Sequence, residues 1–217
     1  MLQPHAIAPQ GPAFSPLIAG YWRLMEWGMT PQQLVQFIEH HLALGITTVD
    51  HADIYGDYRC EAAFGEALRL APQLRQQLQI VTKCGIATRA KPEHKIGHYI
   101  TEASHILHSA ENSLRHFATD YLDLLLIHRP DPLMDADEIA EAFLQLHQSG
   151  KVRYFGVSNF TAAQFTLLQS RLPFSLVTNQ LEISPLEQSA LLDGTLDQCQ
   201  QTRMRPMAWS CLGGGRL

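Results

Sequence analysis

Four polar side chains that together could catalyse proton transfer stand at or just after the ends of apolar runs. Asp50 ends ITTVD, and Tyr55 comes five residues later. Lys83 ends QIVTK, and His128 ends YLDLLLIH. Free tyrosine has a pKa of about 10, so a nearby lysine ammonium is needed to stabilise the phenolate and lower that pKa. A carboxylate would hold the ammonium in place and a histidine would orient a carbonyl oxygen, so the set suits protonation of an oxygen.

Each of the four residues also has an ordinary structural interpretation. Asp50 could cap a turn, Lys83 could be a solubilising charge, Tyr55 could be an amphipathic rim residue and His128 a satisfied structural group. Their joint occurrence at successive strand ends favours catalysis. The set supplies neither a nucleophile nor a metal site, so a reduction here would take its hydride from a cofactor. The His40–His41 pair lies in a predicted helix and lacks a third ligand, so no metal is predicted.

The elements that must position these residues alternate between short apolar runs and longer amphipathic stretches. Helices are predicted at 31–44, 60–70, 101–117, 135–150, 161–171 and 191–200. The first has a capping box, Thr30 with Gln33, and ends at Gly45. Loop 88–98, which contains RAKPEHK, is predicted to be a mobile insertion. Strands are predicted at 17–22, 46–50, 79–83, 121–128, 152–158, 174–180 and 205–210.

Near-continuous apolar strands that alternate with helices predict a parallel sheet covered by helices. Two architectures fit this pattern, the doubly wound sheet and the (β/α)8 barrel. GYWRLMEWG after the first strand contains no GxGxxG, and the repetition shows no change of domain, so a barrel is favoured. We predict a single barrel domain over residues 1–217. Because active sites of such barrels lie at the carboxyl ends of the strands, closure would bring the four polar side chains to one rim.

A closed barrel takes about 250 residues, whereas only CLGGGRL follows the last predicted strand. The expected fold is therefore a (β/α)8 TIM barrel without its last helix, strand and helix. The open edges of its first and seventh strands would invite association with another chain.

Composition narrows the function classes. The chain has a net charge of −5 and a pI of about 6.1, which argues against a nucleic-acid surface. With 46% hydrophobic residues a full core is expected, yet no run approaches the roughly 20 apolar residues of a membrane span. The N-terminus does not resemble a signal peptide, and the four scattered cysteines are typical of reduced thiols. We expect a cytoplasmic protein.

Five motifs, VDHADIYG, TKCG, LLLIHRPD, GVSNF and TNQLEISP, occur in an order and spacing that resemble the aldo-keto reductases. The segments GYWRL and AWSCLGGGRL resemble a bacterial oxidoreductase branch of that family. The resemblance covers the chain from about Ile18. It implies a (β/α)8 barrel that binds NADPH without a Rossmann domain and reduces aldehydes or ketones to alcohols.

The resemblance also implies roles for individual residues. Tyr55 would be the general acid, tuned by Lys83 and Asp50, and His128 would position the carbonyl group of the substrate. The implied cofactor and substrate residues fall into four groups: the carboxamide-binding set Ser158, Asn159 and Gln180; the stacking residue Trp209; Gly20 and Trp22 at the mouth; and Ser210, Leu212 and Gly213 in a pyrophosphate-binding loop.

Two departures from the family pattern affect these expectations. His51 stands where the family has a small threonine, so the surroundings of Asp50 are expected to be more polar, unless His51 faces the adjoining loop. The segment that grips the adenosine 2′-phosphate and adenine is not part of this sequence, so NADPH is expected without excluding NADH.

Two functions follow. The first is an NAD(P)H-dependent carbonyl reductase acting on a small molecule, monomeric as in the full-length family. The alternative is a catalytically impaired, truncated barrel that acts as a partial gene product or a binding subunit.

Overall fold

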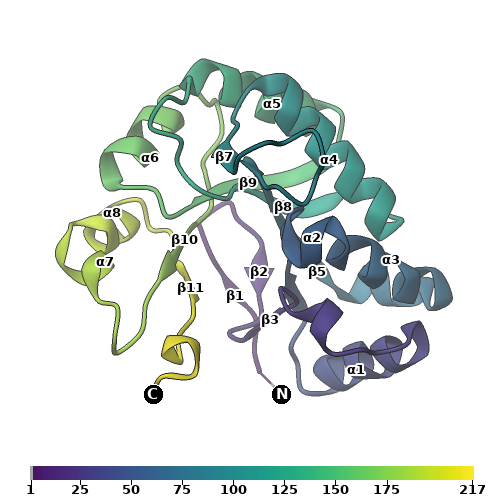
Figure 1. Cartoon of the computed structure of the whole chain (residues 1–217). Coiled ribbons are helices and arrows are strands. Elements are labelled where there is room, and N and C mark those ends of the chain that lie inside the picture. The colour runs from purple at the N-terminus through teal and green to yellow at the C-terminus, as the bar shows by residue number, and fades with distance from the viewer. Residues whose placement is uncertain (1) are drawn as a thin grey trace.

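The computed structural model describes residues 2–217, and its centre is a curled, seven-stranded parallel sheet (Figure 1). The strand order is β11-β10-β9-β8-β5-β4-β3, so strands that follow one another in the chain are neighbours in the sheet, as in a barrel. The seven strands are β3 (Ile18–Gly20), β4 (Thr48–Asp50), β5 (Gln79–Cys84), β8 (Leu122–Ile127), β9 (Val152–Ser158), β10 (Asn179–Glu182) and β11 (Met207–Trp209). The predicted incomplete (β/α)8 barrel is confirmed.

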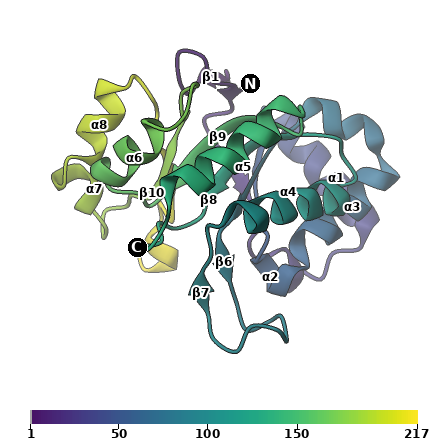
Figure 2. The same ribbon diagram turned by 90° about the horizontal axis from the view of Figure 1, so that it is seen from above.

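Helices cover the outer face of the sheet (Figures 1 and 2). The longer ones are α1 (Pro31–Ala43), α3 (Cys60–Leu70), α4 (Ala103–Phe117), α5 (Ala136–Gln148), α6 (Ala162–Gln169) and α8 (Thr195–Gln201). Short ones are η1 (Leu24–Glu26), α2 (Tyr55–Tyr58), η2 (Pro72–Gln77), α7 (Ser189–Leu192) and η3 (Gly213–Gly215). The predicted capping box of α1 is confirmed, since Thr30 and Gln33 bond reciprocally. A second box, Thr161 with Gln164, begins α6.

The middle of the sheet is buried on both faces because helices cover one face and curvature encloses the other. All six residues of β8 are buried, which explains why its sequence, LDLLLI, lacks the alternation of a half-exposed strand. Phe143 of α5 packs on Phe155 of β9, with 4.4 Å between the ring centroids. Such packing holds the central strands in place, and these strands carry the site residues at their carboxyl ends.

An N-terminal hairpin, β1 (His5–Ala6) with β2 (Ala13–Phe14), lies between the two edge strands at the amino ends of the strands (Figure 1). Arg205, just before β11, donates its backbone N–H to the Ile7 carbonyl oxygen at 2.7 Å. Ser15 donates its backbone N–H to the Thr48 hydroxyl of β4 at 3.1 Å. The hairpin therefore connects opposite sides of the curled sheet. The sequence pattern did not predict it.

The strand predicted at 174–180 begins only at Asn179, as β10. The predicted loop 88–98 forms most of the connection in a projecting hairpin, β6 (Ile86–Ala87) with β7 (His98–Tyr99) (Figure 2), and its mobility stays a prediction. The helix predicted at 191–200 is divided into α7 and α8 because Gly194 adopts φ 84°, a left-handed conformation that ends one helix before the next begins. No helix in the described part of the chain has the length and hydrophobicity needed to cross a membrane.

Candidate active site

A buried lysine connects three of the four predicted catalytic residues. Lys83, at the end of β5, has a side chain only 1% exposed. Its ammonium donates to Asp50 Oδ2 at 2.7 Å, to the His51 carbonyl oxygen at 2.6 Å and to the Tyr55 hydroxyl at 3.2 Å. Since an ammonium has three N–H donors, every donor is used and its position is fixed.

Tyr55 reaches this site because the chain turns sharply after β4. Gly56 and Asp57 have φ values of 57° and 56°. A β-carbon at Gly56 would lie 2.5 Å from Met25 Cγ and 2.6 Å from Cys60 Sγ, so only glycine fits there. Tyr55 comes just before this left-handed turn, and its hydroxyl lies 3.2 Å from the Lys83 ammonium. The motif VDHADIYG contains this glycine, but the sequence pattern offers no reason for it.

His128 lies next to Tyr55, with their ring centroids 5.8 Å apart in an edge-on arrangement. Burial first, and then the positive charges of Lys83 and Arg129, lower the pKa of His128 to about 3. The imidazole is therefore neutral at physiological pH. A neutral ring keeps one N–H donor, which can orient a carbonyl oxygen without supplying a proton itself.

The pKa of Tyr55 moves in the opposite direction from the prediction. Lys83 does lower it, but burial has the larger effect, and the net result is a pKa raised above its usual value of 10. The sequence could not weigh these effects because burial depends on the whole fold. At neutral pH Tyr55 therefore keeps its proton, as a general acid requires.

The catalytic side chains open into a cavity of about 450 Å³. It is lined by ten of the predicted site residues: Gly20, Trp22, Asp50, Tyr55, His128, Ser158, Asn159, Gln180, Trp209 and Ser210. Lys83 does not line the cavity itself but bonds to Asp50 and Tyr55, which do. Leu212 and Gly213 do not line the cavity, since Leu212 is 73% exposed and Gly213 packs towards Leu186.

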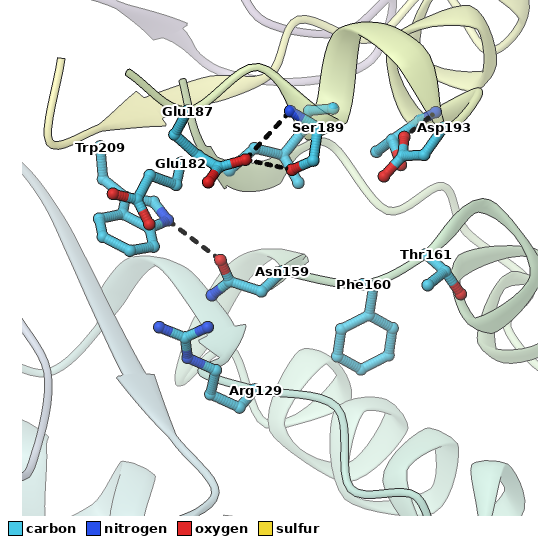
Figure 3. Close-up of a pocket in the computed structure, with 12 residues that line it drawn as sticks. Arg129, Asn159, Phe160, Thr161, Glu182, Glu187, Ser189, Asp193 and Trp209 are labelled. Atoms are coloured by element: carbon cyan, nitrogen blue, oxygen red, sulfur yellow. Dashed lines mark hydrogen bonds between the residues drawn. The ribbon is translucent and has the colours of Figure 1, made fainter. Parts of the chain in front are cut away.

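Predicted carboxamide-binding residues are connected to the catalytic group by hydrogen bonds. Gln180 donates from Nε2 to Asp50 Oδ1 at 2.9 Å. Ser158 donates from Oγ to the Gln180 carbonyl oxygen at 2.9 Å, and Asn159 donates to Ser158 Oγ at 2.8 Å. Trp209 Nε1 donates to Asn159 Oδ1 at 3.1 Å, as Figure 3 shows. One network therefore extends from Trp209 to Asp50.

Sequence reasoning missed Arg129, which lines this cavity and a neighbouring one of about 280 Å³ (Figure 3). Its place directly after His128, inside the motif LLLIHRPD, was the available signal. Ile18, Met207, Ala208 and Cys211 also line the larger cavity. Among the residues from 2 to 217, no group of three or more His, Cys, Asp or Glu side chains could hold a metal ion.

The expectation that His51 makes the surroundings of Asp50 more polar is wrong. His51 is fully buried, and neither ring nitrogen has a hydrogen-bond partner. It stacks on Tyr21 with centroids 4.9 Å apart and contacts the edges of Phe64 and Phe117 at 4.6 and 5.0 Å. Burial holds the pKa of His51 well below its usual value, so the ring is a neutral member of an aromatic cluster. Only its backbone carbonyl contributes to the site, by accepting from Lys83.

Asp53 is a partly buried acidic residue behind the site. Its Oδ2 accepts from Ser109 Oγ at 2.8 Å, while its buried Oδ1 has no partner. Burial, and next the negative charge of Glu61, raise the pKa of Asp53 from 3.8 to about 7. As pH rises from 3.8 to 7, the unfolded chain loses this proton first, so the folded state loses stability over that range.

We therefore expect Asp53→Asn to be more stable than the parent chain at pH 8, by about 2–4 kcal/mol. The gain should shrink as the pH falls towards about 4, where both states hold the proton. Urea unfolding at several pH values measures it. Asp57→Asn is the control, because that carboxylate is 75% exposed in the same turn. An Asp53→Asn protein that is less stable than the parent at pH 8 would contradict the assignment.

Comparison with known proteins agrees with this architecture. Residues 16–217 match the profile of the "Aldo/keto reductase family". Oxidoreductase YdhF of Escherichia coli (strain K12) is 73% identical over the whole chain, which covers 73% of that protein. A 6-dehydroglucose reductase of Agrobacterium fabrum is 50% identical over 94% of this chain and 69% of its own length.

A solved structure is also similar. The aldo/keto reductase from Klebsiella pneumoniae in complex with NADP and acetate superposes with a TM-score of 0.78 and 28% identity, covering 100% of this chain and 71% of that one. The chain thus spans between 69% and 73% of the length of these three proteins.

Proposed function

Because the chain belongs to the aldo/keto reductase family of oxidoreductases, we propose that it reduces the carbonyl group of an aldehyde or ketone to an alcohol, with a reduced nicotinamide cofactor. The observation that carries this proposal is the hydrogen-bonded set Asp50, Lys83 and Tyr55, whose tyrosine faces a cavity beside His128.

Each residue of this set has a separate task. Tyr55 remains protonated at neutral pH because its pKa is raised, so it gives its proton to the carbonyl oxygen. The Lys83 ammonium, 3.2 Å away, stabilises the phenolate that forms. Asp50 balances the charge of Lys83 and fixes its orientation. His128, neutral because its pKa is lowered, donates a hydrogen bond to the same carbonyl oxygen and holds it towards Tyr55.

The cavity fits the nicotinamide end of NADPH. When bound, this cofactor supplies the hydride. Ser158, Asn159 and Gln180 offer the hydroxyl and amide groups that a carboxamide needs, and the Trp209 ring forms an adjoining wall. A β-carbon on Gly20 would meet nothing within 4 Å, so this side of the cavity is open to a ligand. The complex of the Klebsiella reductase with NADP supports NADPH, and NADH remains a candidate.

Cofactor binding is expected to quench the emission of Trp209. The chain has three tryptophans, and Trp22 and Trp27 are 55% and 37% exposed. Titration with NADPH should give saturable quenching that Trp209→Phe largely removes and Trp27→Phe retains. Adding benzaldehyde to the same samples should cause cofactor oxidation. Quenching that survives in Trp209→Phe would show that the cofactor lies elsewhere, and no oxidation with any carbonyl would refute the proposed reaction.

A further inference from the structure

Arg129 is a half-buried cation that makes no ion pair and no side-chain hydrogen bond with residues 2–217. In residues 2–217, five arginines take part in neither an ion pair nor a side-chain hydrogen bond: Arg23, Arg89, Arg129, Arg203 and Arg205. Four of these are exposed to solvent, whereas Arg129 is not. A charge withdrawn from water gains most from an oppositely charged partner. Within residues 2–217 no carboxylate forms an ion pair with Arg129, although three carboxylates line the smaller cavity that it shares.

The position of Arg129 is adjacent to the reacting group. It follows His128 directly and lines the catalytic cavity. Its guanidinium carbon lies 5.5 Å from the centre of the Trp209 ring, and Figure 3 shows the side chain directed towards Asn159 and Trp209. Its positive charge lowers the pKa values of both His128 and Tyr55, which places it within electrostatic reach of the two groups that would hold the carbonyl.

The acidic side chains near Arg129 form no ion pair with it, and some of them bond to other residues. Asp50 bonds to Lys83 and Gln180. Glu187 accepts from Ser189 at the far wall of the smaller cavity. Glu182 and Asp193 also line that cavity, and neither forms an ion pair with Arg129. The N–H donors of the guanidinium therefore make no hydrogen bond with residues 2–217, and Arg129 lines the catalytic cavity.

We propose that Arg129 is a specificity-determining residue that binds a carboxylate, or an equivalent oxyanion, carried by the carbonyl substrate. A guanidinium fork matches the two oxygens of a carboxylate, and such charge-assisted pairs are strong. Arg129 follows β8 directly after His128, the residue that would hold the substrate carbonyl, so we assign the anion to the substrate; a cofactor phosphate is the other occupant that the test below distinguishes. This inference rests on the proposed function and gives it a substrate class, small carbonyl compounds with an acidic substituent.

Calorimetric binding to the chain saturated with NADP+ tests the proposal without turnover. The probes are 4-hydroxybutanoate and its neutral analogue 1,4-butanediol. The chain should bind the carboxylate more tightly, and Arg129→Gln should weaken that binding by about tenfold to a hundredfold while changing diol binding less than about twofold. Arg129→Lys, which keeps the charge but loses the fork, should be intermediate. Arg205→Gln is the matched control, because Arg205 is exposed and precedes β11 at the opposite end.

Three results would overturn the proposal. One is equal affinity of the parent chain for carboxylate and diol. Another is equal loss of both probes in Arg129→Gln. The third is weaker NADP+ binding in Arg129→Gln with the preference for carboxylate intact, which would assign the guanidinium to a cofactor phosphate. Reduction of succinic semialdehyde, 4-hydroxybutanal and butanal is measured in parallel. If none is reduced while carboxylate binding depends on Arg129, the anion site stands and the proposed reaction fails.

Discussion

Tyr55→Phe is expected to lower kcat/KM for aldehyde reduction about a thousandfold, because the variant lacks the proton that the carbonyl oxygen must receive. The fold should be unaffected. The hydroxyl of Tyr55 makes a single side-chain hydrogen bond, to Lys83 at 3.2 Å, and phenylalanine keeps the ring against His128. Quenching of tryptophan emission by NADPH should therefore remain near the parental level.

Initial rates with saturating NADPH measure this effect. Tyr58→Phe is a matched control from the same short helix, since its hydroxyl only accepts from the Thr88 backbone at 3.0 Å. That variant should keep its rate within a few-fold of the parent. A Tyr55→Phe enzyme that retains more than about a tenth of the parental kcat/KM would show that another group donates the proton.

Lys83→Met is expected to lower both activity and stability. It removes one partner of a buried ion pair, leaves Asp50 uncompensated and deprives the His51 carbonyl oxygen of its donor. Removing one member of such a pair costs about 3–5 kcal/mol of unfolding free energy. The phenolate of Tyr55 would also lose its nearest positive charge, so kcat/KM should fall by about a thousandfold.

The double variant Asp50→Asn with Lys83→Met separates the two effects. It removes the unpaired charge, so it should recover part of the unfolding free energy measured in urea, but none of the activity. If Lys83→Met is as stable as the parent, the ion pair between Asp50 and Lys83 does not contribute to the unfolding free energy as expected. If the double variant regains the parental rate, the charge of Lys83 is not needed for reduction.

The strand ends were predictable because two simple rules coincide. Asp50, Lys83 and His128 each follow an apolar run that only a buried strand explains, and parallel strands in a barrel end at one rim. The hydrophobic pattern alone therefore predicts that these three side chains lie close together. Tyr55 was harder to place, since it lies five residues beyond the end of β4, next to a left-handed turn at Gly56, rather than at a strand end.

The remaining errors concern quantities that depend on tertiary surroundings. The net pKa of Tyr55 reflects how deeply the fold buries it, and His51 is neutral because Tyr21, Phe64 and Phe117 enclose it. Neither the pKa of Tyr55 nor the neutral state of His51 can be read from the residues next to it in the sequence. Similarly, no pattern in the sequence showed that Arg129 would lack a carboxylate partner, because pairing depends on groups distant in the chain.

Transfer of isotope from the cofactor to the substrate tests the central claim most directly. The chain would be incubated with NADPH deuterated at the transferring C4 position and with benzaldehyde, and the alcohol analysed by mass spectrometry. The proposed mechanism predicts benzyl alcohol with one deuterium on the carbinol carbon, formed at a rate that Tyr55→Phe almost abolishes. No labelled alcohol from a chain that demonstrably binds NADPH, or labelled alcohol formed by Tyr55→Phe at the parental rate, would contradict it.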